Sequence, residues 1–65
     1  MTLREIREAY DRNYRQMLEL IAKMGGEGNI AYHRKRKTRL FFKLRNLQKI
    51  EHWLSSLEES ILSNE

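Results

Sequence analysis

A chain of 65 residues without cysteine forms one small domain with neither disulfides nor a cysteine-based zinc site, and no apolar run is long enough to span a membrane. Because a lone core of this size is marginally stable, we expect self-association or a larger assembly to complete the fold. The net charge of +4 is uneven, because residues 1–28 are neutral, residues 29–50 carry eight cations and no acid, and residues 51–65 carry four acids and no Lys or Arg.

The first predicted element is a helix over residues 3–24. Thr2 and Glu5 fit a capping box, in which a hydroxyl and a carboxylate bond each other's backbone N–H groups. Apolar residues then recur at steps of three and four, which predicts one seam along the helix, with Asn13 as its polar exception. The seam contains Leu3, Ile6, Tyr10, Asn13, Met17, Leu20 and Met24.

The three glycines of the chain lie together and predict a turn over residues 25–29, with Gly25 ending the first helix. A second helix is expected over residues 30–62, capped by Asn29. Its apolar stripe consists of Leu40, Leu44, Leu47, Ile50, Leu54, Leu57 and Ile61. A later start at Thr38, after a long loop over residues 25–37, is the alternative, because cations near a helix N-terminus are disfavoured by the helix dipole.

The predicted fold class is all-α, an antiparallel two-helix hairpin with a longer second helix, completed by dimerisation into a helical bundle. A helix of residues 30–62 would be about 50 Å long, against about 33 Å for residues 3–24. The end of the second helix would then extend past the first and expose an apolar ridge, which indicates an interface. In an antiparallel dimer, each acidic segment 51–65 would face the basic segment of the other chain.

The strongest functional signal is the cluster of cations on the second helix. Phosphate contact is one interpretation, with stacking by Tyr32. A solvated or ion-paired surface, neutralised by the acidic segment of a partner, is the other main interpretation, and an acidic protein or membrane surface is a third. The predicted nucleic-acid or anion-binding residues are Arg34, Lys35, Arg36, Lys37, Arg39, Lys43, Arg45 and Lys49.

Phe42 and Trp53 lie eleven residues apart and share one side of the second helix, roughly opposite the leucine stripe. Because Trp is enriched among interface anchors, this side predicts a second protein contact. Partial cover by Lys and Arg stems is the alternative. The predicted protein-interface residues are Phe42, Trp53, Leu54, Leu57, Ile61 and Leu62.

No residue pattern in the chain indicates catalysis. His33 and His52 are too far apart on one helix to share a metal, and we interpret both as surface histidines. Glycines 25, 26 and 28 lack the Lys-Ser/Thr pair and the preceding strand of a phosphate-binding loop. We therefore expect a non-enzymatic protein with no cofactor, metal or small-molecule substrate. The charged stretch MTLREIREAY is not typical of a signal peptide, so a cytoplasmic or nuclear location is expected.

The stretch HRKRKTRLFFKLRNLQKIEHWL, residues 33–54, resembles the long helix of the GINS subunits of the eukaryotic and archaeal replicative helicase assembly. In one subunit type an Arg/Lys cluster precedes an aromatic residue, a basic-Leu-Arg run and a Trp. The matching positions here are Arg34 to Lys37, Phe41, Lys43-Leu44-Arg45 and Trp53. The chain departs from the family in lacking the small β-rich domain and much of the helical domain. The resemblance implies a non-enzymatic helical subunit beside DNA-processing machinery.

Two function classes follow from the sequence. The first is a small basic helical binding protein, associated with nucleic acid or with a nucleic-acid-processing assembly. The second is a protein-interaction module, an adaptor or inhibitor, whose cations serve self-assembly or an acidic protein partner. In both classes we expect a homodimer or a place in a hetero-complex, and no membrane partner.

Overall fold

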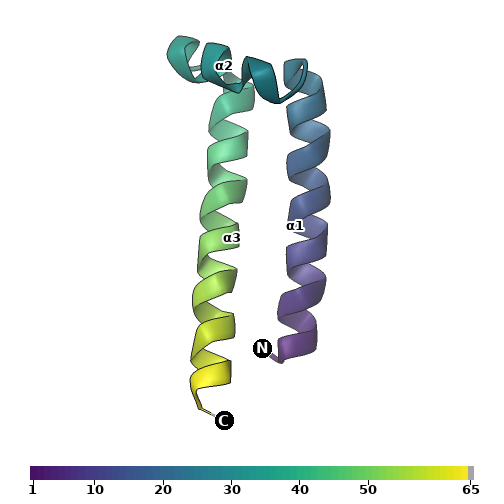
Figure 1. Cartoon of the computed structure of the whole chain (residues 1–65), viewed down its shortest axis with the longest axis vertical. Helices are drawn as coiled ribbons and strands as arrows, with labels where there is room; N and C mark the ends of the chain where they lie inside the picture. The colour runs from purple at the N-terminus through teal and green to yellow at the C-terminus, as the bar shows by residue number, and fades with distance from the viewer. Residues whose placement is uncertain (65) are drawn as a thin grey trace.

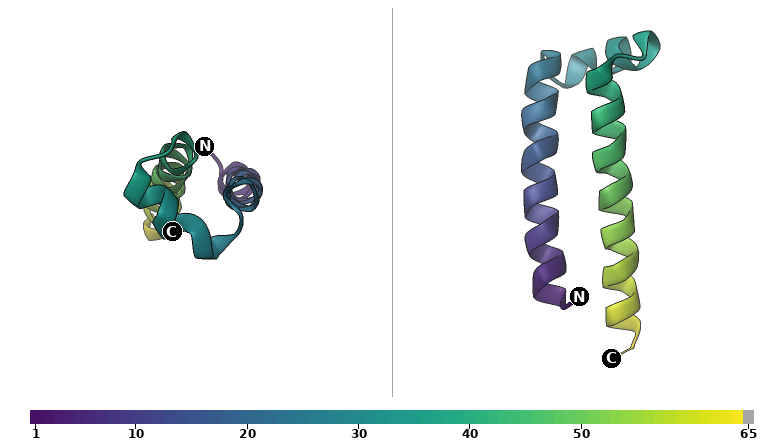
Figure 2. Two further views of the ribbon diagram at one scale, coloured as in Figure 1. Left: turned by 90° about the horizontal axis from the view of Figure 1, so that it is seen from above. Right: turned by 180° about the vertical axis from the view of Figure 1, so that it is seen from behind.

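The computed structural model describes residues 1–64, and every regular element among them is helical, which confirms the predicted fold class at the level of all-α. Its elements are α1 (Leu3–Met24), the 3-10 turn η1 (Glu27–Asn29), α2 (Ile30–Arg36) and α3 (Arg39–Ser63). Helices α1 and α3 lie side by side and run in opposite directions, while α2 lies across one end of the pair (Figures 1 and 2). The described chain is elongated, with extents of 44 × 18 × 16 Å.

Helix α1 begins and ends where local chemistry dictates. The Glu5 amide donates to the Thr2 hydroxyl at 3.2 Å, and the Thr2 amide donates to Glu5 Oε1 at 3.2 Å, which completes the capping box. At the other end Gly25 adopts φ +99°, a left-handed conformation that favours glycine. The Gly25 and Gly26 amides donate to the carbonyls of Ala22 and Ile21.

The second predicted helix is divided in two, so the expected continuous helix of residues 30–62 is wrong. Lys37 has φ +53° and ψ +48°, which ends α2, and Thr38 adopts extended backbone and caps α3 by accepting from the Phe41 amide at 3.3 Å. The alternative start at Thr38 is therefore correct for α3, whereas residues 25–37 form η1 and α2 instead of a long loop. A left-handed lysine has no glycine or proline signal, and for this reason the break is hard to detect.

Asn29 does not cap α2 as expected, since its side chain makes no capping hydrogen bond there. Its amide nitrogen instead donates back to the Met24 carbonyl at 3.2 Å. A side chain at position 25 would push the Asn29 side chain away from the Met24 carbonyl, so this contact favours glycine in addition to the positive φ. The turn is thus tied to the last carbonyls of α1.

The core lies along the contact between α1 and α3. Its fully buried side chains are Ile6, Leu44 and Leu54, and Leu20 and Met24 are nearly so. Around Leu20, Met24 and Leu44, six partly buried apolar side chains complete the packing. These are Met17, Ile21, Ile30, Leu40, Phe41 and Leu47. Helix α2 contributes no buried residue.

The predicted apolar overhang at the end of the second helix is also wrong. Because α3 begins only at Arg39, its 25 residues nearly match the 22 of α1, and α3 extends only slightly beyond the N-terminal end of α1 (Figure 1). Leu54 is 1% exposed, and Leu57 and Ile61 are partly buried. Glu65, the last acid of the segment predicted to face a partner's cations, lies outside the described residues.

Two polar contacts join α1 to α3 within this packing. Asn13, only 5% exposed, donates from Nδ2 to the Leu47 carbonyl at 2.9 Å. Nearer the chain ends, the Tyr10 and Ser55 hydroxyls hydrogen-bond each other. The polar exception on the predicted seam is therefore buried and bonded across the helix pair.

Candidate functional site

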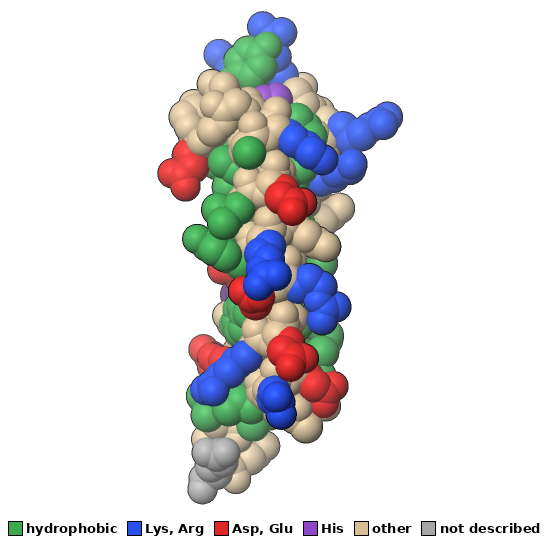
Figure 3. Space-filling view, turned by 90° about the vertical axis from the view of Figure 1, so that its right-hand side faces the viewer, with side chains coloured by type: hydrophobic (Ala, Val, Ile, Leu, Met, Phe, Trp, Pro, Cys, Tyr) green, Lys and Arg blue, Asp and Glu red, His purple; other side chains and the backbone are tan. Residues whose placement is uncertain are grey.

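Five predicted anion-binding residues lie at the end of the molecule where α2 meets α3, and we call them the corner cations. They are Arg34, Lys35, Arg36, Lys37 and Arg39, all of which are exposed. In Figure 3, Lys and Arg side chains gather at the end that carries α2, whereas acidic and basic side chains are interspersed along the rest of this face. The corner cations therefore occupy one region of the surface.

The break at Lys37 changes the electrostatic setting of this cluster. In a continuous helix the cations would crowd an N-terminus, but Arg34, Lys35 and Arg36 instead occupy the last turn of α2. Cations there interact favourably with the helix dipole, by about 0.3–1 kcal/mol each when exposed. The structure thus gives part of the cluster a local stabilising role that the sequence did not indicate.

His33 holds α2 against both long helices. Its Nε2 lies 3.1 Å from the Met24 carbonyl at the end of α1, and its Nδ1 lies 2.9 Å from the Thr38 hydroxyl that caps α3. A tautomer with hydrogen on Nε2 satisfies both contacts, because it donates to the carbonyl and accepts from Thr38. The interpretation of His33 as a simple surface histidine is wrong; His52 is exposed as expected.

Tyr32 forms a cation–π contact with Arg36, one of the corner cations. The Arg36 guanidinium lies 4.7 Å from the centroid of the Tyr32 ring, one helical turn away. The ring also meets the His33 imidazole edge-on at 5.4 Å. Tyr32 remains exposed beside the corner cations.

The other three predicted anion-binding residues lie on two different sides of α3. Lys43 borders a shallow hollow between α1 and α3 together with Lys23. Arg45 and Lys49 border another hollow on α3 with His52. The eight predicted cations therefore do not form one surface: the corner cations gather at one end, and Arg45 and Lys49 form a separate pair further along α3.

None of these eight cations is neutralised by a carboxylate in residues 1–64. The salt bridges in that part of the chain join Arg4 to Glu8 at 3.7 Å and Arg15 to Asp11 at 2.9 Å, both within α1. Exposed pairs of this kind contribute little to stability. Within residues 1–64, no salt bridge therefore offsets the charge of the corner cations.

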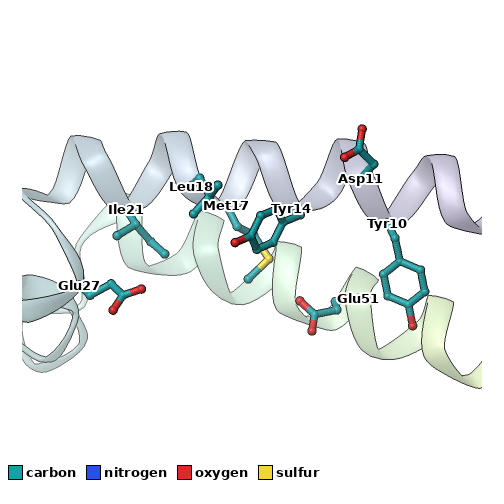
Figure 4. Close-up of a pocket in the computed structure, with 8 residues that line it drawn as sticks. All are labelled: Tyr10, Asp11, Tyr14, Met17, Leu18, Ile21, Glu27 and Glu51. Atoms are coloured by element: carbon teal, nitrogen blue, oxygen red, sulfur yellow. The ribbon is translucent and has the colours of Figure 1, made fainter.

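A second candidate site, which the sequence did not predict, is a groove of about 460 Å³ between α1 and α3. Tyr10, Tyr14, Met17 and Ile21 project from α1 towards α3, and the Glu51 carboxylate faces them from α3 (Figure 4). The signal for it was present, because Tyr14 and Ile21 broaden the apolar seam on one side. The remaining lining residues are Asp11, Leu18 and Glu27.

The predicted protein-interface residues are also divided by the structure. Phe42 and Trp53 are 46% and 54% exposed, and Leu62 is exposed at the end of α3. Leu54 belongs to the core instead, and Leu57 and Ile61 are partly covered. The accessible part of the predicted interface is therefore the outer side of α3.

Other classes of site were sought in the described chain. Residues 1–64 contain no group of three His, Asp or Glu side chains placed to hold a metal ion. None of the helices in that range is long and apolar enough to cross a membrane. Comparison with protein-family models, curated proteins and solved structures finds no match to this chain.

Proposed function

We propose that this chain is a non-enzymatic, basic nucleic-acid-binding protein whose contact surface is formed by the corner cations. The observation that carries the proposal is their arrangement: five exposed cations at one end, with no carboxylate partner in residues 1–64. The helix dipole favours cations at the end of α2, but five neighbouring positive charges also repel one another. A polyanion relieves that repulsion and releases its counterions on binding.

The corner also meets the geometric needs of a phosphate-binding surface. The α1–α3 pair, together with the His33 contacts to Met24 and Thr38, fixes the position of α2. The corner cations therefore project from the end of α2 and the start of α3, and not from a long loop. Because they contact phosphates and no base-reading element accompanies them, binding is expected to be independent of nucleotide sequence.

The test is the salt dependence of binding to a short DNA duplex. Five phosphate contacts predict a slope of log K against log salt of about −4.5. Neutralising three corner cations with Arg34→Gln, Lys35→Gln and Arg39→Gln should reduce the slope to about −2 and weaken binding at low salt. A matched control, Arg7→Gln, Arg12→Gln and Lys23→Gln, removes the same charge from α1 and should leave the slope nearly unchanged.

Two outcomes would contradict the proposal. One is the absence of measurable binding by the wild-type chain to duplex DNA or single-stranded RNA at low salt. The other is an equal loss in the two triple variants, because that result reflects net charge and not a localised surface. Comparing the duplex with single-stranded RNA identifies the preferred nucleic acid, and circular dichroism verifies that each variant remains helical.

A protein-interaction module is the second candidate, favoured by the exposure of Phe42 and Trp53 on the outer side of α3. The resemblance to GINS subunits bears on both candidates, because it implies a non-enzymatic helical subunit beside DNA-processing machinery. The break at Lys37 divides the resembling stretch, so only its part from Arg39 onward lies in one helix. A Trp53→Ala variant that loses a captured protein while keeping its salt slope on DNA would favour this candidate.

A further inference from the structure

Tyr32 is an aromatic side chain on the same short helix as three of the corner cations. Lys35 and Arg36 follow it by three and four residues, so the three side chains share one side of α2, and all are exposed. Ile30 and His33, on the other side, are partly buried and face the helix pair. Tyr32, Lys35 and Arg36 therefore project away from the body of the molecule, and Figure 3 shows hydrophobic surface among the Lys and Arg side chains at this end.

The Tyr32 ring is held in position although it is exposed. The Arg36 guanidinium lies over one face of the ring, 4.7 Å from its centroid. The His33 imidazole packs against the ring at nearly a right angle, with 5.4 Å between the centroids, and is itself bonded to the end of α1 and to the cap of α3. Tyr32 nevertheless stays 53% exposed. The ring is thus a fixed aromatic surface that opens to solvent beside positive charges.

This arrangement suits a ligand better than it suits stability. An exposed ring buries little apolar surface, and a cation–π contact at an exposed site is weak. Tyr32 therefore contributes little to the stability of the fold. A side chain that is already confined, however, loses little conformational entropy when a ligand covers it. The open face of the ring is a prepared surface for a flat ligand.

The chemistry of this surface matches an unpaired nucleotide. Every base has a π face that stacks on an aromatic ring, and the phosphate beside it needs a cation. Tyr32 supplies the ring, and Lys35, one helical turn away, supplies the charge. Inside a duplex each base is covered by its neighbours in the stack, so a base face reaches the ring only where the strand is unpaired.

We propose that the corner binds single-stranded nucleic acid, with an unpaired base stacked on the open face of Tyr32 and the flanking phosphates on Lys35 and the other corner cations. This site rests on the proposed function and specifies the form of nucleic acid that is bound. Stacking does not distinguish the bases, so it agrees with binding that is independent of nucleotide sequence. Single strands of DNA and RNA share the chemistry that the site requires.

The first measurement uses salt to separate stacking from charge. Five phosphate contacts predict a slope of log K against log salt of about −3.5 on a single strand, against about −4.5 on a duplex. Stacking releases no ions, so its contribution should persist as the salt concentration rises. At the upper end of a salt titration, a short oligothymidylate should therefore be bound more tightly than a duplex of the same length.

The second measurement removes the ring. Tyr32→Leu keeps α2 helical, because Leu favours helices more than Tyr does. It should weaken the binding of oligothymidylate by about fivefold or more, the least that the loss of one stacked base predicts, and leave the salt slope unchanged. Binding to the duplex should change little. Tyr32→Phe keeps the ring and should bind oligothymidylate like the wild type.

A matched control is Tyr14→Leu, which removes a tyrosine that is 60% exposed and lies outside the corner, in the groove between α1 and α3. This variant should bind the single strand and the duplex as the wild type does. Circular dichroism verifies that each variant keeps its helical content. A loss for Tyr14→Leu as large as for Tyr32→Leu would show that the effect does not come from the corner, and it overturns the proposal.

An abasic oligomer completes a thermodynamic cycle, because it keeps the phosphates and lacks the bases. The wild type should bind it about as weakly as Tyr32→Leu binds oligothymidylate. Tyr32→Leu should not weaken this binding further, since the ring has no base to stack on. If the substitution weakens the abasic and the normal oligomer equally, the ring acts through the structure of the corner and the stacking site is excluded.

The stacking site and the nucleic-acid binding fail in different ways. If the duplex gives its slope of about −4.5 while neither oligothymidylate nor oligouridylate depends on Tyr32, the stacking site is wrong and the proposed function stands. If no nucleic acid binds at low salt, both are wrong. Binding of either single strand that depends on Tyr32 supports the site, and the tighter of the two identifies DNA or RNA as its preferred ligand.

Discussion

The α1–α3 pair and the corner that α2 forms across its end are held in place by different interactions. In the pair, Ile6, Leu44 and Leu54 are at most 1% exposed, so apolar burial dominates. Helix α2 has no fully buried residue; its Ile30 packs partly against the core, and hydrogen bonds of His33 and of the preceding Asn29 complete its attachment. Apolar packing along its whole length couples the pair cooperatively, whereas one partly buried side chain and a few polar contacts fix the corner locally. The corner can therefore open without unfolding the pair.

The largest expected effect comes from breaking the pair. Leu44→Ala removes a fully buried side chain at the centre of the core and should lower the free energy of unfolding by about 3 kcal/mol. Because so small a domain has little stability to lose, most of the helical signal in circular dichroism should disappear. The matched control is Gln48→Ala, at an exposed position of the same helix, and equal stabilities of the two variants would contradict the assigned core.

An intermediate effect should follow from releasing the corner. His33→Ala removes the contacts to Met24 and Thr38 and should cost about 1–2 kcal/mol, or about 1 kcal/mol for each hydrogen bond. Amide hydrogen exchange should accelerate in α2 more than in the middle of α1. His52→Ala, which replaces an exposed histidine, is the control, and uniform acceleration in both helices would show that the corner and the pair unfold together.

A smaller change of opposite sign is expected at the break between α2 and α3. Lys37 holds a left-handed conformation that costs a lysine about 1 kcal/mol or more and a glycine very little. Lys37→Gly should therefore raise the free energy of unfolding by about 0.5 kcal/mol, after allowing for the entropy of glycine. Lys37→Ala removes the same charge but keeps the strain, so a gain of equal size in chemical denaturation of both variants would exclude this explanation.

The smallest effect concerns pH and the beginning of α1. Hydrogen bonds from the Thr2 amide and hydroxyl hold the pKa of the Glu5 carboxyl below its ordinary value of 4.5. A carboxyl whose pKa is lower in the folded chain stabilises it fully above the ordinary value, and this contribution is lost as pH falls through the lowered pKa. Thermal unfolding between neutral and acidic pH should show this loss, and Glu5→Gln should reduce it.

Sequence reasoning succeeded where the governing chemistry is local. Thr2 with Glu5, and Gly25 with its positive φ, give α1 the bounds Leu3–Met24 expected from their residue types. It failed at Lys37, where a residue with no special turn preference adopts a left-handed conformation at the end of α2, between His33 and Thr38, whose side chains hydrogen-bond each other. That single error made the second helix too long and created the false overhang.

For the candidate sites too, local features could be predicted from the sequence, whereas features that depend on how the helices pair could not. Exposure of the corner cations could be expected from their charge, but the placement of Arg34, Lys35 and Arg36 on a different helix from Lys43, Arg45 and Lys49 depends on the break at Lys37. The groove was not predicted, because it needs the relative rotation of two helices as well as the pattern of each. Tyr14 could be placed beside the seam from its spacing, whereas the proximity of Glu51 required the paired structure.

Asn13 has a consequence for how the two long helices find their alignment during folding. Leucines recurring every three or four positions would allow α3 to slide along α1 by one turn, about 5.4 Å, and still bury apolar surface. In such a slipped pairing the Asn13 amide would lose the Leu47 carbonyl and face apolar side chains, at a cost of about 1–3 kcal/mol. Slipped hairpins should therefore be short-lived intermediates that rearrange to the native alignment, and Asn13→Leu should let them accumulate during refolding.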